Sequence, residues 1–126
     1  HQRGLITYVR VYRGTLRANS PLLNANTGAR ERPIRLLAIR ADELRDVAEV
    51  GAGHIGAVLG LKGTVTGHTL LDARVPPAAA LRLPSVVVPP PVYVCAVEPE
   101  TQADAEPLEA ALTALQREDP SLQVAL

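Results

Sequence analysis

Six glycines between Gly51 and Gly67 constrain the fold of this chain more than any other feature. They lie at positions 51, 53, 56, 60, 63 and 67, and short apolar runs such as Ala57–Leu59 separate them. A helix is disfavoured, because each interior glycine costs about 1 kcal/mol relative to alanine. Short strands with sharp bends fit better, since glycine adopts positive φ and lets two backbones approach closely. Small closed barrels need such bends, so this stretch predicts a β-barrel.

The residues around the glycine-rich stretch favour further short strands. β-Branched and aromatic residues favour strands, and Arg13-Gly14, Asn19-Ser20-Pro21 and Asn26-Thr27-Gly28 are typical of turns. The acidic segment 40–49 is expected to be a loop. Strands are expected at 5–11, 15–17, 22–24, 32–39 and 69–71. We therefore expect residues 1–75 to form the barrel.

The last third of the chain has a different composition. Residues 76–91 hold six prolines and predict a semi-rigid linker. Beyond them, Val92–Val97 favours a strand, and a helix with one apolar face is expected to run from Asp104, as its cap, to Asp119. Residues 122–126 resemble a strand that is cut short. Residues 92–126 thus predict an incomplete β-α-β unit, and the fold class is mainly β.

Composition and charge suggest a fragment with an anionic partner. The chain contains no Met, so we expect it to be part of a longer protein, and its one Cys excludes an internal disulfide. No run of 18 apolar residues indicates a membrane span, so no membrane partner is expected. Net charge is zero, yet residues 1–40 carry eight Arg and one Glu, a sum of +7. Such asymmetry suggests that one end of the chain contacts an anionic partner. The alternative is that both halves fold together and the charges lie on one mixed surface.

The sequence contains no recognisable catalytic set. Gly60-Leu61-Lys62-Gly63-Thr64 lacks the order and spacing of a phosphate loop. His54 and His68 could share a metal, but zinc needs three or four ligands, so two surface histidines at strand ends are the favoured interpretation. Cys95 lies in an apolar segment and is expected to be a buried structural thiol. We expect no catalytic residue, cofactor or metal in this chain.

Arginines in the predicted strands and turns favour phosphate contact. Their guanidinium groups can line one edge of the barrel and bind phosphate oxygens. Only Tyr8 and Tyr12 lie near for base stacking, so contact with the backbone of a structured nucleic acid is favoured over single-strand binding. These arginines are at positions 10, 13, 17, 30, 32 and 35.

A series of short phrases closely resembles elongation factor G, the translocation GTPase of ribosomes. They occur in order along nearly the whole chain, and together they are specific. The phrases include Val11-Tyr12-Arg13-Gly14-Thr15-Leu16, Ala52-Gly53-His54-Ile55, Gly60-Leu61-Lys62, Thr66-Gly67-His68-Thr69-Leu70 and Glu118-Asp119-Pro120-Ser121. The resemblance covers the second domain of the family, a translation-factor β-barrel, and the start of its third, a partial α+β, ferredoxin-like β-α-β unit.

The resemblance implies a non-catalytic part of a parent GTPase. GTP and Mg²⁺ would bind a GTPase domain that this chain lacks. The barrel would contact that GTPase domain and small-subunit ribosomal RNA, and would help relay the GTP state during elongation. The residues expected to make these contacts are Arg10, Arg13, Arg30, Arg32 and Lys62. The location would be the cytoplasm or an organellar matrix.

Three positions depart from the family pattern. The family usually has Ser at Arg13, and Asp at both His54 and His68. A turn Asp often bonds nearby amides, which neutral His does less well. The departures leave other roles open: a ribosome-recycling paralogue, including the organellar form, a ribosome-protection protein, or a stand-alone barrel that acts as a protein-interaction adaptor.

Overall fold

A computed structural model describes residues 5–41, 43–76 and 79–125. The chain divides into two compact units, which we call the barrel unit and the C-terminal unit. The barrel unit comprises the residues up to Thr64 together with His68–Leu83. The C-terminal unit comprises Val65–Gly67 and the residues from Pro84 onward.

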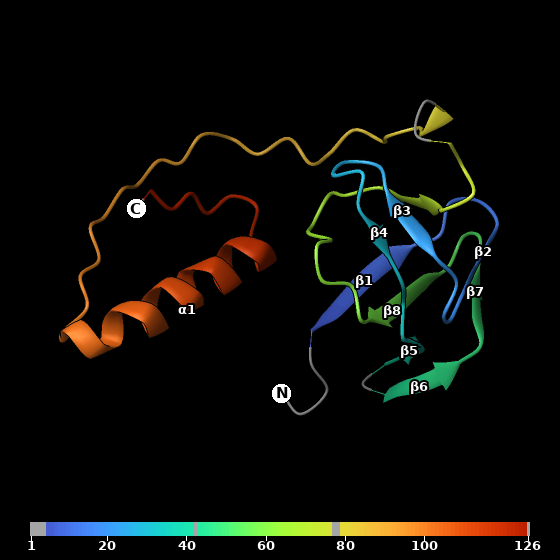
Figure 1. The fold of residues 1–126 in the computed structure, drawn as a ribbon, viewed down its shortest axis with the longest axis horizontal. Helices are drawn as coiled ribbons and strands as arrows, with labels where there is room; N and C mark the ends of the chain where they lie inside the picture. Colours follow the sequence, from blue (N-terminus) through green and yellow to red (C-terminus); the bar gives the residue numbers. More distant parts are fainter. Residues whose placement is uncertain (1–4, 42, 77–78, 126) are drawn as a thin grey trace. The chain divides into compact units, whose positions relative to one another are not determined.

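The described part of the barrel unit forms three antiparallel sheets (Figure 1). The first has the strand order β1-β8-β5-β6, the second pairs β2 with β7, and the third has the order β4-β3-β9. This arrangement confirms the mainly β class. The strands are β1 (Ile6–Arg10), β2 (Thr15–Arg17), β3 (Leu22–Asn24), β4 (Arg30–Glu31), β5 (Arg35–Arg40), β6 (Glu43–Val47), β7 (Glu49–Gly51), β8 (Ile55–Leu59) and β9 (Leu70–Asp72).

An aliphatic core lies between the sheets. Its buried members come from several strands and loops: Val11, Leu22, Leu36, Val50, Val58 and Leu61. The neighbouring residues Leu37 and Ala57 point to the opposite face of the first sheet, where they form a second cluster with Leu59. Because successive side chains of a strand alternate between faces, the central strands β5 and β8 are apolar on both sides.

Glycines make the bends that the sequence predicts. Gly53, Gly60 and Gly67 have positive φ, at 85°, 98° and 85°. At Gly60 a side chain is excluded for two reasons. The positive φ is unfavourable for other residues, and an added Cβ would lie 2.6 Å from Cγ1 of Ile34. Gly60 therefore permits both the turn after β8 and the close approach of the segment before β5.

Two strand predictions in the barrel unit are wrong. Segment 40–49 is not a loop: most of it forms β6 and β7, and β6 pairs with β5 from Leu36↔Val47 to Arg40↔Glu43. Segment 32–39 is not one strand, because the chain turns at Pro33 and Ile34 between β4 and β5. Pro33 has no N–H for a ladder, and its carbonyl instead accepts a hydrogen bond from the N–H of Asn19 at 2.8 Å.

In the C-terminal unit the predicted helix is confirmed. It consists of the short 3-10 helix η2 (Gln102–Asp104) and the α-helix α1 (Ala105–Glu118). The predicted capping role of Asp104 is wrong, since its side chain makes no capping hydrogen bond. Its carboxylate instead accepts the hydroxyl hydrogen of Thr101 at 2.6 Å.

The strands predicted beside this helix are absent from the described residues. Val92–Val97 and residues 122–125 have no strand pairing, because the described part of this unit contains no strand with which they could pair. Leu126 lies outside the described residues. Cys95 is exposed, so the prediction of a buried thiol is also wrong.

Candidate nucleic-acid interface

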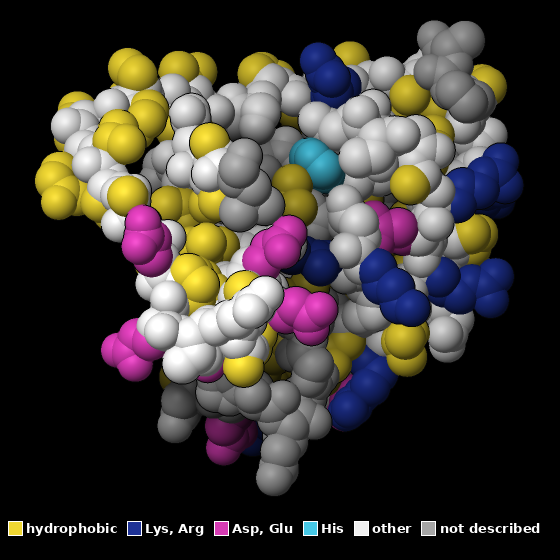
Figure 2. Space-filling model, turned by 60° about the vertical axis from the view of Figure 1, so that its left-hand side comes forward, with side chains coloured by type: hydrophobic (Ala, Val, Ile, Leu, Met, Phe, Trp, Pro, Cys, Tyr) yellow, Lys and Arg dark blue, Asp and Glu magenta, His cyan; other side chains and the backbone are white. Residues whose placement is uncertain are grey.

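Almost all described cationic residues belong to the barrel unit, the exception being Arg117. Figure 2 shows several Lys and Arg side chains gathered on the right-hand side of the view, with fewer Asp and Glu among them. The five residues predicted to contact RNA or a GTPase domain are all exposed. The structure separates them into two groups, one at each end of β8.

The first group, Arg10 and Arg13, lies where β8 begins. Arg10 ends β1 and pairs with Ile55, and its guanidinium carbon lies 5.8 Å from the ring centre of Tyr12. Arg13 follows in an exposed turn. His54 lies beside this group, because its carbonyl accepts a hydrogen bond from the N–H of Val11 at 3.0 Å.

The second group, Arg30, Arg32 and Lys62, lies beyond the end of β8 and is joined through Glu31. One oxygen of the Glu31 carboxylate accepts hydrogen bonds from the backbone N–H of Lys62 at 2.7 Å and of Gly63 at 3.0 Å. The other oxygen accepts the hydroxyl hydrogen of Thr64. We call these three bonds the Glu31 clamp. The clamp holds the backbone of Lys62 beside the strand that carries Arg30.

The clamp favours the charged form of Glu31. Partial burial alone would raise the pKa of the carboxyl group. Hydrogen bonds from Thr64, from the backbone of Gly63 and Lys62, and from Asn24 outweigh this effect, so the pKa lies below its usual value. Glu31 is therefore an anion at neutral pH that is bonded mainly to backbone and hydroxyl groups.

A buried polar network supports the clamp from inside. Asn24 is fully buried, and its amide nitrogen donates to the Thr64 hydroxyl at 3.3 Å and lies 3.0 Å from Nδ1 of His68. Its carbonyl oxygen accepts the N–H of Asn26 and of Thr27, at 3.0 and 3.2 Å. Since the amide nitrogen can only donate, Nδ1 of His68 is the acceptor in their bond. The network thus connects the β3–β4 hairpin with the segment before β9.

His54 and His68 do not come together. His54 is exposed, and its Nδ1 lies 3.2 Å from the carbonyl oxygen of Ala52, whereas His68 bonds Asn24 at the far end of β8. Within 5–41, 43–76 and 79–125, no group of three His, Cys, Asp or Glu side chains could hold a metal ion. Neither does any helix in these ranges have the length and hydrophobicity needed to cross a bilayer.

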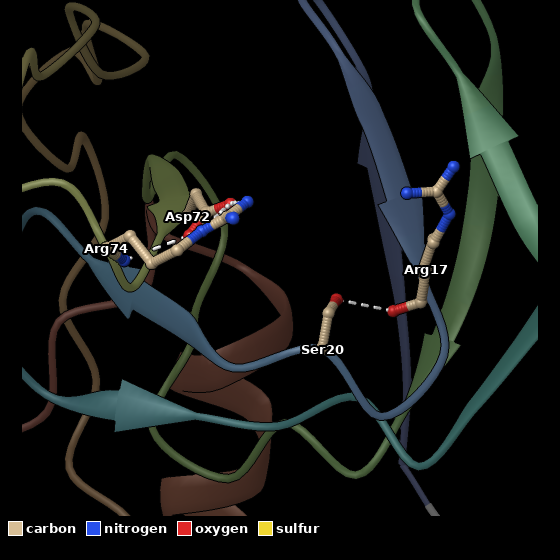
Figure 3. Close-up of polar contacts among 4 residues, drawn as sticks. All are labelled: Arg17, Ser20, Asp72 and Arg74. Atoms are coloured by element: carbon tan, nitrogen blue, oxygen red, sulfur yellow. Dashed lines mark hydrogen bonds and ion pairs between the residues drawn. The ribbon is translucent and has the colours of Figure 1, made fainter.

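Four of the six other described arginines of the barrel unit differ from the candidate residues in their partners, the exceptions being Arg40 and Arg82. Four exposed arginines form ion pairs with carboxylates: Arg17 with Glu49, Arg35 with Asp46, Arg45 with Glu43 and Arg74 with Asp72. Figure 3 shows the last pair, and also Arg17, whose carbonyl accepts the Ser20 hydroxyl at 2.6 Å. Among the described residues, no carboxylate pairs with the side chains of Arg30, Arg32 or Lys62, so these remain available to an external anion.

Sequence reasoning found these cations but missed the residues that position them. Glu31 was visible only as one acidic residue between two arginines, Asn24 only as the last residue of a predicted strand, and Thr64 only as the end of a segment that lacks the phosphate-loop pattern. Their roles depend on contacts across 31 to 40 residues of chain. The one local signal was Asn24 at the start of a turn, a position at which Asn often bonds backbone two residues later.

Comparison with known protein families identifies the family to which the barrel unit belongs. A protein-family model described as elongation factor G domain 2 matches residues 1–73, more than half of the chain. The chain belongs to the elongation factor G family. A second family model, described as elongation factor G domain III, matches residues 88–126. The resemblance inferred from the short phrases is therefore confirmed, and the chain carries parts of two elongation factor G domains.

A solved structure supports the same assignment over nearly the whole chain. A crystal structure of a protein from Thermus thermophilus is similar to this chain, with a TM-score of 0.76 and 28% sequence identity. The similarity covers 98% of this chain but 18% of that protein's chain. This chain thus spans less than a fifth of the length of that relative.

Proposed function

We propose that this chain is a non-catalytic part of an elongation-factor-G-like translational GTPase, and that its barrel unit docks on RNA of the small ribosomal subunit. The observation that carries the proposal is the group Arg30, Arg32 and Lys62. Its members are exposed and unpaired with carboxylates among the described residues. Guanidinium and ammonium groups in such a position bind phosphate oxygens.

The proposal includes a parent protein with its own nucleotide site. GTP and Mg²⁺ would bind a GTPase domain outside this chain, because this sequence has no phosphate loop. The barrel unit would contact that domain and relay its nucleotide state to the ribosome, in the cytoplasm or in an organellar matrix. Arg10 and Arg13, at the opposite end of β8, are the second pair of candidate contacts with RNA or with that domain.

Binding of the complete protein to purified small ribosomal subunits tests the docking role. Replacing Arg30, Arg32 and Lys62 together by Ala removes three cations and should weaken binding. The slope of log affinity against log salt should fall by about 2 to 3, since each phosphate contact contributes nearly one unit. A variant with Ala at Arg17, Arg45 and Arg74 is the matched control, because it removes the same charge from arginines that already have carboxylate partners.

Two results would contradict the docking role. Equal weakening by the control would mean that general charge, not this group, attracts the ribosome. Binding that does not depend on salt would favour the protein-adaptor alternative, for which exposed apolar side chains such as Tyr8 and Ile55 on the first sheet are available. Translocation, recycling and ribosome-protection assays with the complete protein then distinguish the elongation role from its two paralogous alternatives.

A further inference from the structure

The segment that carries Lys62 is fixed on both sides of that residue. Leu61 is 2% exposed within the aliphatic core and Thr64 is 4% exposed, whereas Lys62 and Gly63 between them are exposed. The two exposed residues still have their backbone N–H groups bonded, because both donate to Glu31. The conformation of the segment at Lys62 therefore depends on a carboxylate from another strand.

Glu31 also fixes how Lys62 lies relative to Arg30 and Arg32. The three residues 30 to 32 are consecutive, so adjacent Cα atoms lie about 3.8 Å apart. The carboxylate of Glu31 bonds the Lys62 segment, and the side chains of Arg30 and Arg32, on either side of it in the chain, are exposed. One glutamate side chain thus joins the backbone of Lys62 to the segment that carries both arginines.

The charge of Glu31 opposes this arrangement. Arg30, Arg32 and Lys62 have a formal charge of +3, which Glu31 reduces to +2. By charge alone, a glutamate at this position weakens attraction to phosphate. Its geometric effect is the reverse, because an ordered cation loses less conformational entropy when it binds.

From this juxtaposition we infer that Glu31 is a positioning residue, which holds Lys62 beside Arg30 and Arg32 so that the three cations engage one RNA phosphate backbone together. The inference rests on the proposed docking function. It assigns to an acidic side chain a role in binding an anion, acting through the backbone N–H groups of Lys62 and Gly63. The charge effect and the positioning effect predict opposite signs, so a single substitution separates them.

The test is Glu31→Gln in the complete protein, bound to purified small ribosomal subunits. Glutamine keeps the size of the side chain but loses the charge and one acceptor oxygen. Positioning predicts that affinity falls by roughly 3- to 10-fold, the usual effect of losing one such hydrogen bond. Glu43→Gln is the matched control: it removes the same charge from an exposed ion pair with Arg45, and affinity should stay the same or rise slightly.

Two further measurements separate positioning from general destabilisation. In a Lys62→Ala background, Glu31→Gln should cause little additional loss of affinity, because Glu31 acts through Lys62. Amide exchange at Lys62 and Gly63 should accelerate in Glu31→Gln, while exchange in β5 and β8 stays as in the wild type. The inference is overturned if Glu31→Gln leaves the affinity unchanged or raises it. It is also overturned if Glu31→Gln lowers the affinity as much in the Lys62→Ala background as in the wild type.

Failure of the docking proposal would give a different result. If the wild-type protein itself shows no salt-dependent binding to small subunits, the proposed function is wrong. Amide exchange then still tests the clamp: unchanged exchange at Lys62 and Gly63 in Glu31→Gln would show that Glu31 does not position this segment.

Discussion

The amide nitrogen of Asn24 donates a hydrogen bond to the hydroxyl of Thr64 across 3.3 Å, between residues 40 positions apart in the chain. Both side chains are buried, at 0% and 4% exposure. Thr64 passes the connection on by donating its own proton to Glu31. A buried amide, a hydroxyl and a partly exposed carboxylate thus form one chain of hydrogen bonds between the core and the candidate RNA-binding group.

Asn24→Ala should destabilise the barrel unit by roughly 2–4 kcal/mol, because it removes a fully buried side chain and leaves several of its partners without their hydrogen bonds. These partners are the N–H groups of Asn26 and Thr27 and the Thr64 hydroxyl. Urea denaturation of the wild type and the variant measures the difference. Thr15→Ala, at an exposed position of β2, is the control and should change stability by less than about 0.5 kcal/mol. Equal stability of Asn24→Ala and wild type would show that the network contributes nothing.

Gly60→Ala should be poorly tolerated. The residue has φ of 98°, and an added Cβ would lie 2.6 Å from Cγ1 and 2.9 Å from Cδ1 of Ile34. Backbone strain and this clash together should cost about 2–4 kcal/mol in urea denaturation.

Gly63→Ala is the matched control for Gly60→Ala in the same segment. Its φ is not positive, and the nearest atom to an added Cβ is Oε1 of Glu31 at 3.8 Å, so stability should change by about 0.5 kcal/mol or less. Combining Gly60→Ala with Ile34→Ala removes the two nearest atoms, leaving Cβ of residue 34 at 3.1 Å and the unfavourable φ, so the double variant should lose less stability than the sum of the two single changes. Full additivity would mean that Ile34 is not the obstacle.

Local signals in the sequence were sufficient for much of the barrel. Glycines with positive φ, namely Gly14 and Gly28, lie at predicted turns. The β-branched run at the N-terminus forms β1, and the helical periodicity after Asp104 forms α1. These features depend on backbone freedom and on side-chain periodicity within a few residues, so they can be read without knowing the tertiary structure.

Strand β6 could not be predicted in this way. Glu43, Arg45 and Asp46 give it the composition of an acidic loop, and all three are exposed. It is a strand because β5 supplies hydrogen-bonding partners along its whole length. Charged residues are common on edge strands, where they discourage pairing with other molecules. The converse error occurred at Val92–Val97, where β-branched residues favour a strand but have no partner among the described residues.

For the candidate site, the sequence predicted the cationic residues but not how they group in the fold. Arg30, Arg32 and Lys62 could be named because cations are recognisable in a sequence. That these three lie together, while Arg10 and Arg13 lie at the other end of β8, follows from strand register, which short-range patterns do not determine. The clamp and the buried network depend on register as well, so they appear only in the structure.

Stability should depend on pH through Glu31. Its pKa is lowered in the folded state relative to the usual 4.5, so the unfolded chain binds a proton more readily. The resulting stabilisation is fully present above about pH 4.5 and is lost as pH falls through the lower folded-state value. Urea denaturation of wild type and Glu31→Gln from neutral pH to about pH 3 should show a stability difference that shrinks with acidification. A constant difference would show that the carboxylate is not stabilised by the clamp.

Among the described carboxyl groups of the barrel unit, that of Asp72 should have the most strongly lowered pKa. Its pKa is about 2, because the side chain and backbone N–H groups of Arg74 donate hydrogen bonds to the carboxylate and the guanidinium is nearby. Arg74→Ala should raise this pKa toward the usual 3.8, as measured by NMR titration of the Asp72 carboxyl carbon.

High salt should raise the pKa of Asp72 in the wild type, since added ions screen an exposed pair. The effect should be smaller in Arg74→Ala, where the backbone N–H of residue 74 is the donor to this carboxylate that remains among the described residues. The favourable effect of the pair on folding is present above pH 3.8 and lost as pH falls through about 2. Both residues are exposed, so the thermal midpoint at neutral pH should hardly change in Arg74→Ala. A pKa near 3.8 in the wild type would mean that this ion pair does not persist in solution.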